Sequence, residues 1–326
     1  MCTRVVYSGK NGMVVTGRSM DWKTEMHSNL WVFPKGMERN GETGANSLQW
    51  TSKYGSVVTS AFEIASTDGM NEKGLVANLL WLPETEYPVR DQSKPGLAIT
   101  AWVQYMLDNF ATVDEAVAFI DENTFQVVSD LMPDGSRLAT LHLSISDATG
   151  DCAIFEYTGG KLTVYHSKEY KVMTNSPTYN KQLALNEYWK SIGGLSFLPG
   201  TNRPSDRFAR ASFYINALPQ TDDVRIAIAS VFSVIRNTSV PYGISTPEFP
   251  KISTTQWRTV SDSKNLLYFF ESSLTPNTFW VNLRETDLSE GAPVLKLSIA
   301  NGETYHGNAT KEFKPAQPFR FMGVKG

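Results

Sequence analysis

Short runs of β-branched and aromatic residues, bounded by turn residues, occupy much of the first 85 positions and predict strands. Two of these runs, residues 3–8 and 13–18, flank Gly9-Lys10-Asn11-Gly12, which is typical of a tight turn. We therefore expect the chain to begin with a β-hairpin. Further strands are predicted at residues 30–33, 56–62 and 74–82, the last entered through a turn at Thr67-Asp68-Gly69.

Apolar residues recur at helical spacing in two other parts of the chain. Residues 97–110 show this spacing from Ile99 onward, and Thr112 with Glu115 forms a capping box that should begin the next helix. A second helical block is predicted over residues 179–190, 204–218 and 222–237.

The remaining patterned segments predict strands at residues 140–146, 152–157, 161–166, 256–260, 266–271 and 278–283. Strands and helices are thus segregated along the chain, which disfavours a parallel sheet built from βαβ units. We expect an α+β fold in which two antiparallel sheets are covered by pairs of helices. No repeat or Pro/Ser-rich linker divides residues 1–326, so a single domain is expected.

Composition and charge exclude several classes of function. Of the 326 residues, 41% are hydrophobic and 19% charged, as in ordinary globular proteins. A net charge of −3 offers no basic field to phosphate groups, so nucleic acid is not an expected partner. No apolar run reaches the roughly 18 residues needed to span a membrane, and the first residues lack the features of a signal peptide.

Cysteine and histidine are scarce. The chain has two cysteines, Cys2 and Cys152, and four histidines without metal-binding spacing, so neither a disulfide framework nor a metal ion or other cofactor is expected. We interpret Cys152, His142 and His166 as packing residues on their strands. A catalytic pair of Cys152 with a histidine stays an alternative, and it predicts that Cys2→Ala is harmless.

Cys2 is the candidate nucleophile. A thiol reacts as its thiolate, and removal of Met1 would place a free α-amine beside it. Such an amine titrates at about 7.7–8.0, which suits a base working near neutral pH. The hairpin would return Arg18 and Asp21 to Cys2, where the arginine favours the thiolate and the aspartate holds the ammonium group. An incidental terminal cysteine and a surface Arg/Asp pair are the alternatives.

Other candidate residues have structural alternatives of their own. Asn175 ends a predicted strand, where an amide N–H can stabilise an oxyanion, but an Asx-turn before Pro177 is equally compatible with the pattern. Arg236 closes an apolar helical stretch, where it can also interact with the helix dipole. Trp22 and Trp81 are core residues by their type, but indole rings near a nucleophile often line a pocket.

Five motifs occur in order along the chain: Met1-Cys2-Thr3-Arg4, Gly17-Arg18-Ser19-Met20-Asp21-Trp22, Asn71-Glu72-Lys73-Gly74-Leu75, Met173-Thr174-Asn175-Ser176-Pro177 and Arg236-Asn237-Thr238-Ser239-Val240-Pro241. Together with Ser205-Asp206-Arg207-Phe208, they resemble the choloylglycine hydrolase family, which contains penicillin V acylases and bile salt hydrolases. The resemblance extends over nearly the whole chain.

This resemblance implies a four-layer αββα N-terminal-nucleophile fold and hydrolysis of a linear amide C–N bond without a cofactor. Carried over residue by residue, it makes Cys2 the nucleophile and its freed amine the base. Arg18 and Asp21 would support that pair, Asn175 would stabilise the oxyanion, and Arg236 would complete the catalytic set.

Trp81 departs from the Gram-positive bile salt hydrolases, which have an asparagine at that position. The change removes a side-chain amide at this position, where the backbone N–H can still serve the oxyanion. Trp22 and Trp81 together resemble the Gram-negative penicillin V acylases, which also tend to remove the acyl chain from N-acyl homoserine lactones. Two indole faces can flank a phenoxy ring or an acyl chain without directional hydrogen bonds.

The resemblance leaves other expectations open. The closest rival is bile salt hydrolysis, and a more distant one is a non-catalytic binding protein that keeps Met1. Family likeness also implies a homotetramer with assembly contacts near residues 198–207. Because the Gram-negative relatives are usually exported, a periplasmic location is expected in the native host, and a cytoplasmic one if the chain is complete as given.

Overall fold

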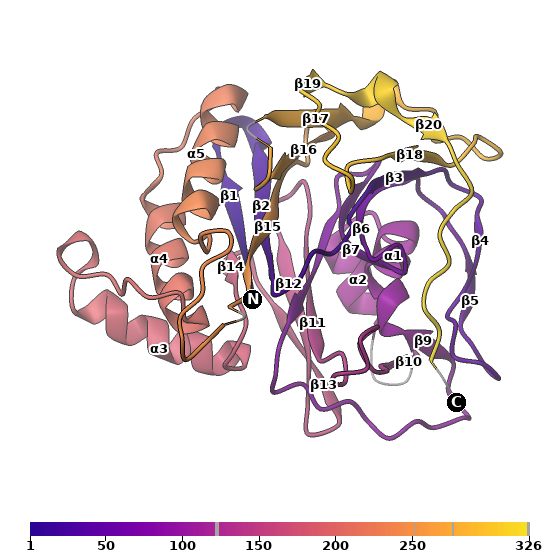
Figure 1. The fold of residues 1–326 in the computed structure, drawn as a ribbon, viewed down its shortest axis with the longest axis horizontal. Coiled ribbons are helices and arrows are strands. Elements are labelled where there is room, and N and C mark those ends of the chain that lie inside the picture. The colour runs from indigo at the N-terminus through magenta and orange to yellow at the C-terminus, as the bar shows by residue number, and fades with distance from the viewer. Residues whose placement is uncertain (121–123, 251, 276, 325–326) are drawn as a thin grey trace.

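The described part of the chain forms four layers, in which two β-sheets lie face to face between two layers of helices (Figure 1). The computed structural model describes residues 1–120, 124–250, 252–275 and 277–324. Within these residues, the strand pairs of the two large sheets are antiparallel except for one pair at the edge of the first sheet. The expected αββα arrangement of two antiparallel sheets is confirmed.

The first sheet contains the N-terminal strand and has the order β14-β1-β2-β15-β16-β17-β19. Helix α4 packs on β1 and helix α5 on β2, while α3 packs on α4 (Figure 1). The strands are β1 (Cys2–Ser8), β2 (Val14–Trp22), β14 (Val172–Met173), β15 (Thr254–Asp262), β16 (Leu267–Ser272), β17 (Thr278–Asn282) and β19 (Gly307–Asn308), and the helices α3 (Tyr179–Ser191), α4 (Pro204–Ala217) and α5 (Val224–Asn237).

The second sheet has the order β13-β12-β11-β8-β7-β6-β3-β18-β20, and helix α1 packs on β7 and β8. Its elements are β3 (Leu30–Phe33), β6 (Ser56–Ala61), β7 (Ala65–Asn71), β8 (Val76–Trp81), β11 (Leu141–Ser146), β12 (Cys152–Thr158), β13 (Lys161–His166), β18 (Leu295–Leu297) and β20 (Lys314–Pro315), with helices α1 (Trp102–Asn109) and α2 (Val113–Phe119). Two small ribbons, β4 (Glu38–Asn40) with β5 (Gln49–Thr51) and β9 (Gly96–Ala98) with β10 (Gln126–Val128), flank it. None of the described helices is long and apolar enough to cross a membrane.

The predicted N-terminal hairpin forms, and its register pairs Cys2 with Met20, between Arg18 and Asp21. Successive side chains of a strand point to opposite faces, so Cys2, Met20 and Arg18 share the face that looks toward the second sheet. The other face of β2 meets helix α5. There a Cβ atom on Gly17 would lie 2.6 Å from Val231 Cγ1, so glycine permits the close approach of helix and strand.

The predicted turn at residues 67–69 is wrong, because these residues lie inside strand β7. Tertiary contacts outweigh their local preference for a turn. The buried Asp68 carboxylate accepts hydrogen bonds from Tyr268 and Asn78, and Gly69 lies close to Leu107 of helix α1.

The first predicted helix is also shorter than expected. Residues 97 and 98 belong to strand β9, which pairs with β10, and α1 begins at Trp102. The expected cap on the next helix is confirmed, since Thr112 Oγ1 accepts a hydrogen bond of 3.2 Å from the Glu115 N–H.

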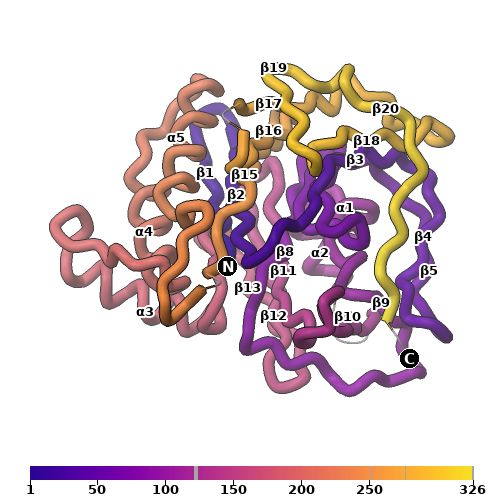
Figure 2. Tube along the Cα trace, viewed as in Figure 1, coloured from indigo at the N-terminus to yellow at the C-terminus, as the bar shows by residue number. Residues whose placement is uncertain are grey.

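The last described residues run back across the half of the molecule that contains the second sheet (Figure 2). The Met322 N–H donates to the Ile64 carbonyl, and the Val324 N–H donates to the Glu42 carbonyl, each at 2.9 Å. This return path brings Met322 to the wall of an apolar pocket that Cys2 also lines.

Candidate active site

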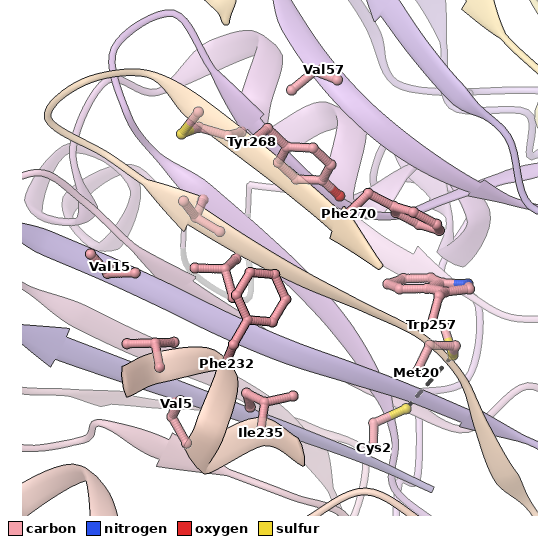
Figure 3. Close-up of a cluster of buried hydrophobic side chains, with 14 of the residues drawn as sticks. Cys2, Val5, Val15, Met20, Val57, Phe232, Ile235, Trp257, Tyr268 and Phe270 are labelled. Carbon is pink, nitrogen blue, oxygen red and sulfur yellow. Dashed lines mark hydrogen bonds between the residues drawn. The ribbon is translucent and has the colours of Figure 1, made fainter. Parts of the chain in front are cut away.

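Cys2 begins strand β1 and is almost completely buried, with 3% of its surface exposed. Its Sγ lies 3.8 Å from Met20 Sδ and 3.7 Å from Arg18 Nη2. Figure 3 shows the sulfur directed toward Met20, with Trp257 beside that contact. The structure therefore places a thiol next to a guanidinium group, as the hairpin argument predicted.

Arg18 is held rigidly in this position. Its Nη2 donates to the Leu79 carbonyl at 2.9 Å, and its Nη1 donates to the Thr67 carbonyl at 3.3 Å. The guanidinium carbon also lies 4.7 Å from the centroid of the Trp257 ring. A planar cation fixed on one face by an aromatic ring can keep its positive charge pointed at the thiol.

Asp68 supplies the negative charge behind Arg18. Its Oδ2 lies 3.5 Å from Arg18 Nη1, and both side chains are fully buried. Tyr268 Oη donates to Asp68 Oδ1 at 2.5 Å, and Asn78 Nδ2 donates to Oδ2 at 2.7 Å. Burial raises the pKa of Asp68, while Arg18 and these hydrogen bonds favour its charged form. Sequence reasoning missed this residue because it interpreted residues 67–69 as a turn.

The backbone nitrogen of Cys2 is bound by Asn175, which follows strand β14. This N–H donates to Asn175 Oδ1 at 2.6 Å, and Asn175 Nδ2 donates to the Trp81 carbonyl at 2.6 Å. Strand β14 pairs with β1, so the sheet itself brings residues separated by 173 positions together. Asn175 therefore connects the backbone nitrogen of Cys2 to the end of strand β8.

Arg207, on helix α4, is a second buried arginine at Cys2. Its Nη1 donates to the Cys2 carbonyl at 2.5 Å, and its Nη2 donates to Asn175 Oδ1 at 2.8 Å. The sequence placed Arg207 in a family motif without giving it a role. Its place in a predicted helix next to the apolar Phe208 and Ala209 could have indicated that it is buried. A buried arginine needs a polar partner, so this position pointed to a polar site.

Asp21 lies on the opposite face of β2 from Arg18, toward helix α4. Its Oδ1 accepts a hydrogen bond of 2.6 Å from Thr255, and its Oδ2 lies 3.9 Å from Arg207 Nη1. Oδ2 is buried and accepts no hydrogen bond from the described residues. A carboxylate oxygen in this state is well suited to an additional cation nearby.

Met1 precedes this cluster and is attached to the nitrogen that Asn175 binds. Its α-amine donates to the Asp21 carbonyl at 2.6 Å, and the Asp21 N–H donates to the Met1 carbonyl at 2.8 Å. Burial lowers the pKa of the Met1 α-amine, although the negative charges of Cys2 and Asp21 oppose this shift. A terminal amine in this region is therefore neutral at lower pH than one in water.

An apolar pocket opens beside Cys2 and contains about 690 Å³ of space, part of it open to solvent. Trp22 and Trp81, at the ends of β2 and β8, lie on its wall with ring centroids 5.4 Å apart and planes at 52°. Other lining residues include Met26, Phe62, Ile64, Leu79, Ile99 and Met132. A pocket of this size and character suits the acyl group of a small ligand.

Arg236 does not lie in the cluster, and the expectation that it completes the site is corrected. Its guanidinium group forms an ion pair with Glu271 and lies 5.0 Å from the Phe232 ring centroid. The side chain is 50% exposed, whereas those of Arg18, Asp21 and Arg207 are fully buried. Arg236 is the next-to-last residue of α5, and its side chain extends to Glu271 on β16 instead of to Cys2.

The second cysteine lacks the geometry of a catalytic pair. Cys152 Sγ accepts a hydrogen bond of 3.5 Å from Arg4, and burial raises the pKa of its thiol. His142 bonds instead to Glu156 at 2.8 Å, and His166 to Asp151 at 2.7 Å.

His166, Asp151 and Asp114 bring three possible metal-ligand atoms within 4.8 Å of one another in the described part of the chain. His166 and Asp114 are exposed, and the imidazole already pairs with both carboxylates. Asp114 lies in α2, Asp151 directly precedes β12, and His166 is the last residue of β13.

Comparisons with known proteins agree with this geometry. The family model described as linear amide C–N hydrolases, choloylglycine hydrolase family, matches residues 2–296. A penicillin V acylase of Pectobacterium atrosepticum is 50% identical, over 99% of this chain and 92% of its own. The solved structure of a penicillin V acylase from Agrobacterium tumefaciens is 57% identical, has a TM-score of 0.93, and covers 99% of this chain and 100% of its own. A bile salt hydrolase/transferase of Clostridium perfringens is 27% identical, over 83% of this chain and 89% of its own.

Proposed function

The chain belongs to the choloylglycine hydrolase family of linear amide C–N hydrolases, and from this membership we propose that it is a penicillin V acylase with Cys2 as nucleophile. One observation carries the proposal: the Cys2 thiol lies on the wall of an apolar, tryptophan-lined pocket while Asn175 and Arg207 bind its backbone. An acyl group in this pocket would bring its carbonyl carbon to the sulfur.

Removal of Met1 precedes the reaction and turns the nitrogen held by Asn175 into a free α-amine. That amine takes the thiol proton, and the Cys2 thiolate attacks the amide carbonyl carbon. Arg18, 3.7 Å from the sulfur, stabilises the thiolate. Asp21 stabilises the ammonium group, because its Oδ2 is buried and has no hydrogen-bond donor among the described residues.

The tetrahedral intermediate then collapses. Asn175 Nδ2 has two protons and gives one to the Trp81 carbonyl, so the other remains for the oxyanion, together with the Trp81 backbone N–H. The C–N bond breaks as the ammonium group returns its proton to the leaving amine, and a Cys2 thioester remains. Water then gives a proton to the same amine, attacks the thioester, and releases the acid and the thiol.

Penicillin V is the proposed substrate because its phenoxyacetyl group can pack against the indole faces that line the pocket. The tilted pair of Trp22 and Trp81 offers contact area without a required hydrogen-bond direction. The acyl chain of an N-acyl homoserine lactone also needs only apolar contacts of this kind. We therefore propose that the same site hydrolyses N-acyl homoserine lactones as a second activity. Bile salts are a weaker candidate, since a broad hydroxylated steroid suits a wider and more polar slot.

A panel of substrates tests the proposal. Purified protein of known N-terminal mass is assayed with penicillin V, a medium-chain acyl homoserine lactone, and glycine- and taurine-conjugated bile salts. We expect the highest kcat/KM with penicillin V, no turnover by Cys2→Ala despite an unchanged fold, and much weaker turnover by Cys2→Ser. Full activity of the alanine variant, or of protein that retains Met1, would contradict the mechanism.

We also propose that the protein assembles as a homotetramer through the tip formed by α3 and the segment after it. Tyr188, Leu195 and Phe197 are 60%, 81% and 60% exposed there, which is unusual for large apolar side chains. This tip precedes the segment 198–207 in which assembly contacts are expected. Light scattering coupled to size exclusion measures the mass, and a monomer at micromolar concentration would contradict this assembly.

A further inference from the structure

A positively charged side chain lies on the tryptophan pair of the pocket. Arg137 belongs to the loop between β10 and β11, which is closed by a hydrogen bond of 2.8 Å from the Met132 N–H to the Arg137 carbonyl. Its guanidinium carbon lies 4.2 Å from the ring centroid of Trp81 and 5.8 Å from that of Trp22. The side chain is exposed, so its cationic group is at the rim of the pocket.

The charge of Arg137 is not neutralised by the protein. In the part of the chain that the structure describes, no carboxylate lies within 4.0 Å of its guanidinium group. Lys23, the other basic residue near Trp22, differs in this respect, because it forms an ion pair of 3.4 Å with Asp134 of the same loop. The ion pair ties the loop to the end of β2, so of these two basic residues only Arg137 has no carboxylate partner among the described residues.

The pocket lining decides which part of a substrate meets this cation. Below the tryptophans the lining is formed almost entirely by apolar side chains, including Leu79, Ile99 and Met132. A carboxylate would lose its hydration there without gaining a partner, so only the acyl part of a substrate can enter. Any charged part of the leaving amine must stay at the rim.

We propose that Arg137 is a specificity-determining residue that selects amides whose leaving amine carries a carboxylate. This inference rests on the proposed function. One face of the guanidinium group is stacked on Trp81, which leaves the N–H groups along its edge free to bind a carboxylate through two hydrogen bonds. Penicillin V has such a carboxylate on its leaving amine, whereas an acyl homoserine lactone is neutral.

The test compares penicillin V with its methyl ester, which has the same acyl group but no negative charge on its leaving amine. Release of the shared phenoxyacetic acid is measured for wild type, Arg137→Gln and Arg137→Lys. Arg225→Gln is the matched control, because Arg225 is 92% exposed and pairs only with Asp223 among the described residues. The readout is the ratio of kcat/KM for the acid to kcat/KM for the ester.

We expect Arg137→Gln to lower this ratio by about 10-fold, mainly through KM for the acid, since it removes a charge-assisted contact. Arg137→Lys should keep most of the ratio and Arg225→Gln all of it, and added salt should lower the ratio in every enzyme that keeps a cation at position 137 but not in Arg137→Gln. An unchanged ratio in an active Arg137→Gln enzyme would overturn the inference and leave the proposed function intact. Failure of the wild type to hydrolyse either substrate would instead contradict the proposed function.

Discussion

The backbone nitrogen of Cys2 lies 2.6 Å from Oδ1 of Asn175, so the nitrogen that we propose as the catalytic amine is already bound while Met1 is attached. The same oxygen accepts a hydrogen bond of 2.8 Å from Arg207. Processing therefore changes the chemistry of this nitrogen without requiring a new position for it. Preorganisation of this kind lowers the cost of orienting the base in each catalytic cycle.

Activity should depend on a free Cys2 amine. A leader fused before Cys2 through a protease site that leaves cysteine as the first residue should give an inactive protein, because an acylated nitrogen cannot accept the thiol proton. Cleavage should restore full activity, measured as penicillin V hydrolysis and followed by intact mass. The same leader on Cys2→Ala is the control and should stay inactive. Activity of the uncut fusion would contradict an amine base.

The acid side of the pH profile should report this amine. Burial lowers the pKa of the Met1 α-amine from its ordinary value of 8.0, and the Cys2 amine lies one residue further into the same buried region. The base works only when neutral, so kcat/KM should stay high below pH 8 and fall as the pH drops through the lowered pKa. Asp21→Asn removes a charge that raises the pKa, and should move this midpoint further down. If the acid limb of kcat/KM in the wild type had its midpoint above pH 8, the prediction of a lowered amine pKa would be wrong.

Arg207 and Arg236 should differ sharply in importance. Arg207→Lys loses one of the two contacts to Cys2 and Asn175, and we expect kcat to fall about 100-fold or more, as when positioning of a reacting group is disturbed. Arg236→Gln removes a partly exposed ion pair worth about 0–1 kcal/mol, so activity should stay within a factor of two. Thermal unfolding shows whether each variant is folded. A large loss of kcat in Arg236→Gln alone would instead favour a place for Arg236 in the catalytic set.

The tryptophan pair should determine binding of the acyl group. Trp22→Ala or Trp81→Ala removes one face of the pair, and each should lower kcat/KM for penicillin V about 10-fold through KM. Phenylalanine at either position should restore much of the loss, because it keeps an aromatic face. The double alanine variant should lose less than the product of the single effects, since the rings contact each other. Multiplicative losses would indicate that the two rings bind independently.

Asp68 should act through Arg18 as a positioning residue. Asp68→Asn leaves the buried Arg18 without its counter-charge, and we expect a fall in kcat of about 10-fold or more with little change in KM. Tyr268→Phe is the matched control, because it removes a hydrogen bond to Asp68 but keeps the charge. If thiol alkylation by iodoacetamide is equally fast in Asp68→Asn and wild type, Asp68 has no influence on the thiolate.

Local patterns predicted the elements that carry strong periodicity. Strand β3 was predicted at its observed bounds, and the position of the hairpin turn correctly predicted that residues 18–21 return beside Cys2. Strand β7 was missed because Asp68 and Gly69 favour a turn locally. Their burial against Tyr268 and Leu107 depends on residues distant in sequence, which local propensity does not contain.

The sequence by itself determined the αββα fold and the family. It also determined the return of Arg18 and Asp21 to Cys2, because an antiparallel hairpin has a fixed register once its turn is placed. Only the tertiary structure decided which distant groups complete the site. Asn175 and Arg207 reach Cys2 because β14 pairs with β1 and α4 packs on it, whereas α5 directs Arg236 toward Glu271. Contacts of this kind depend on how sheets and helices pack, and a sequence read along one dimension does not specify that packing.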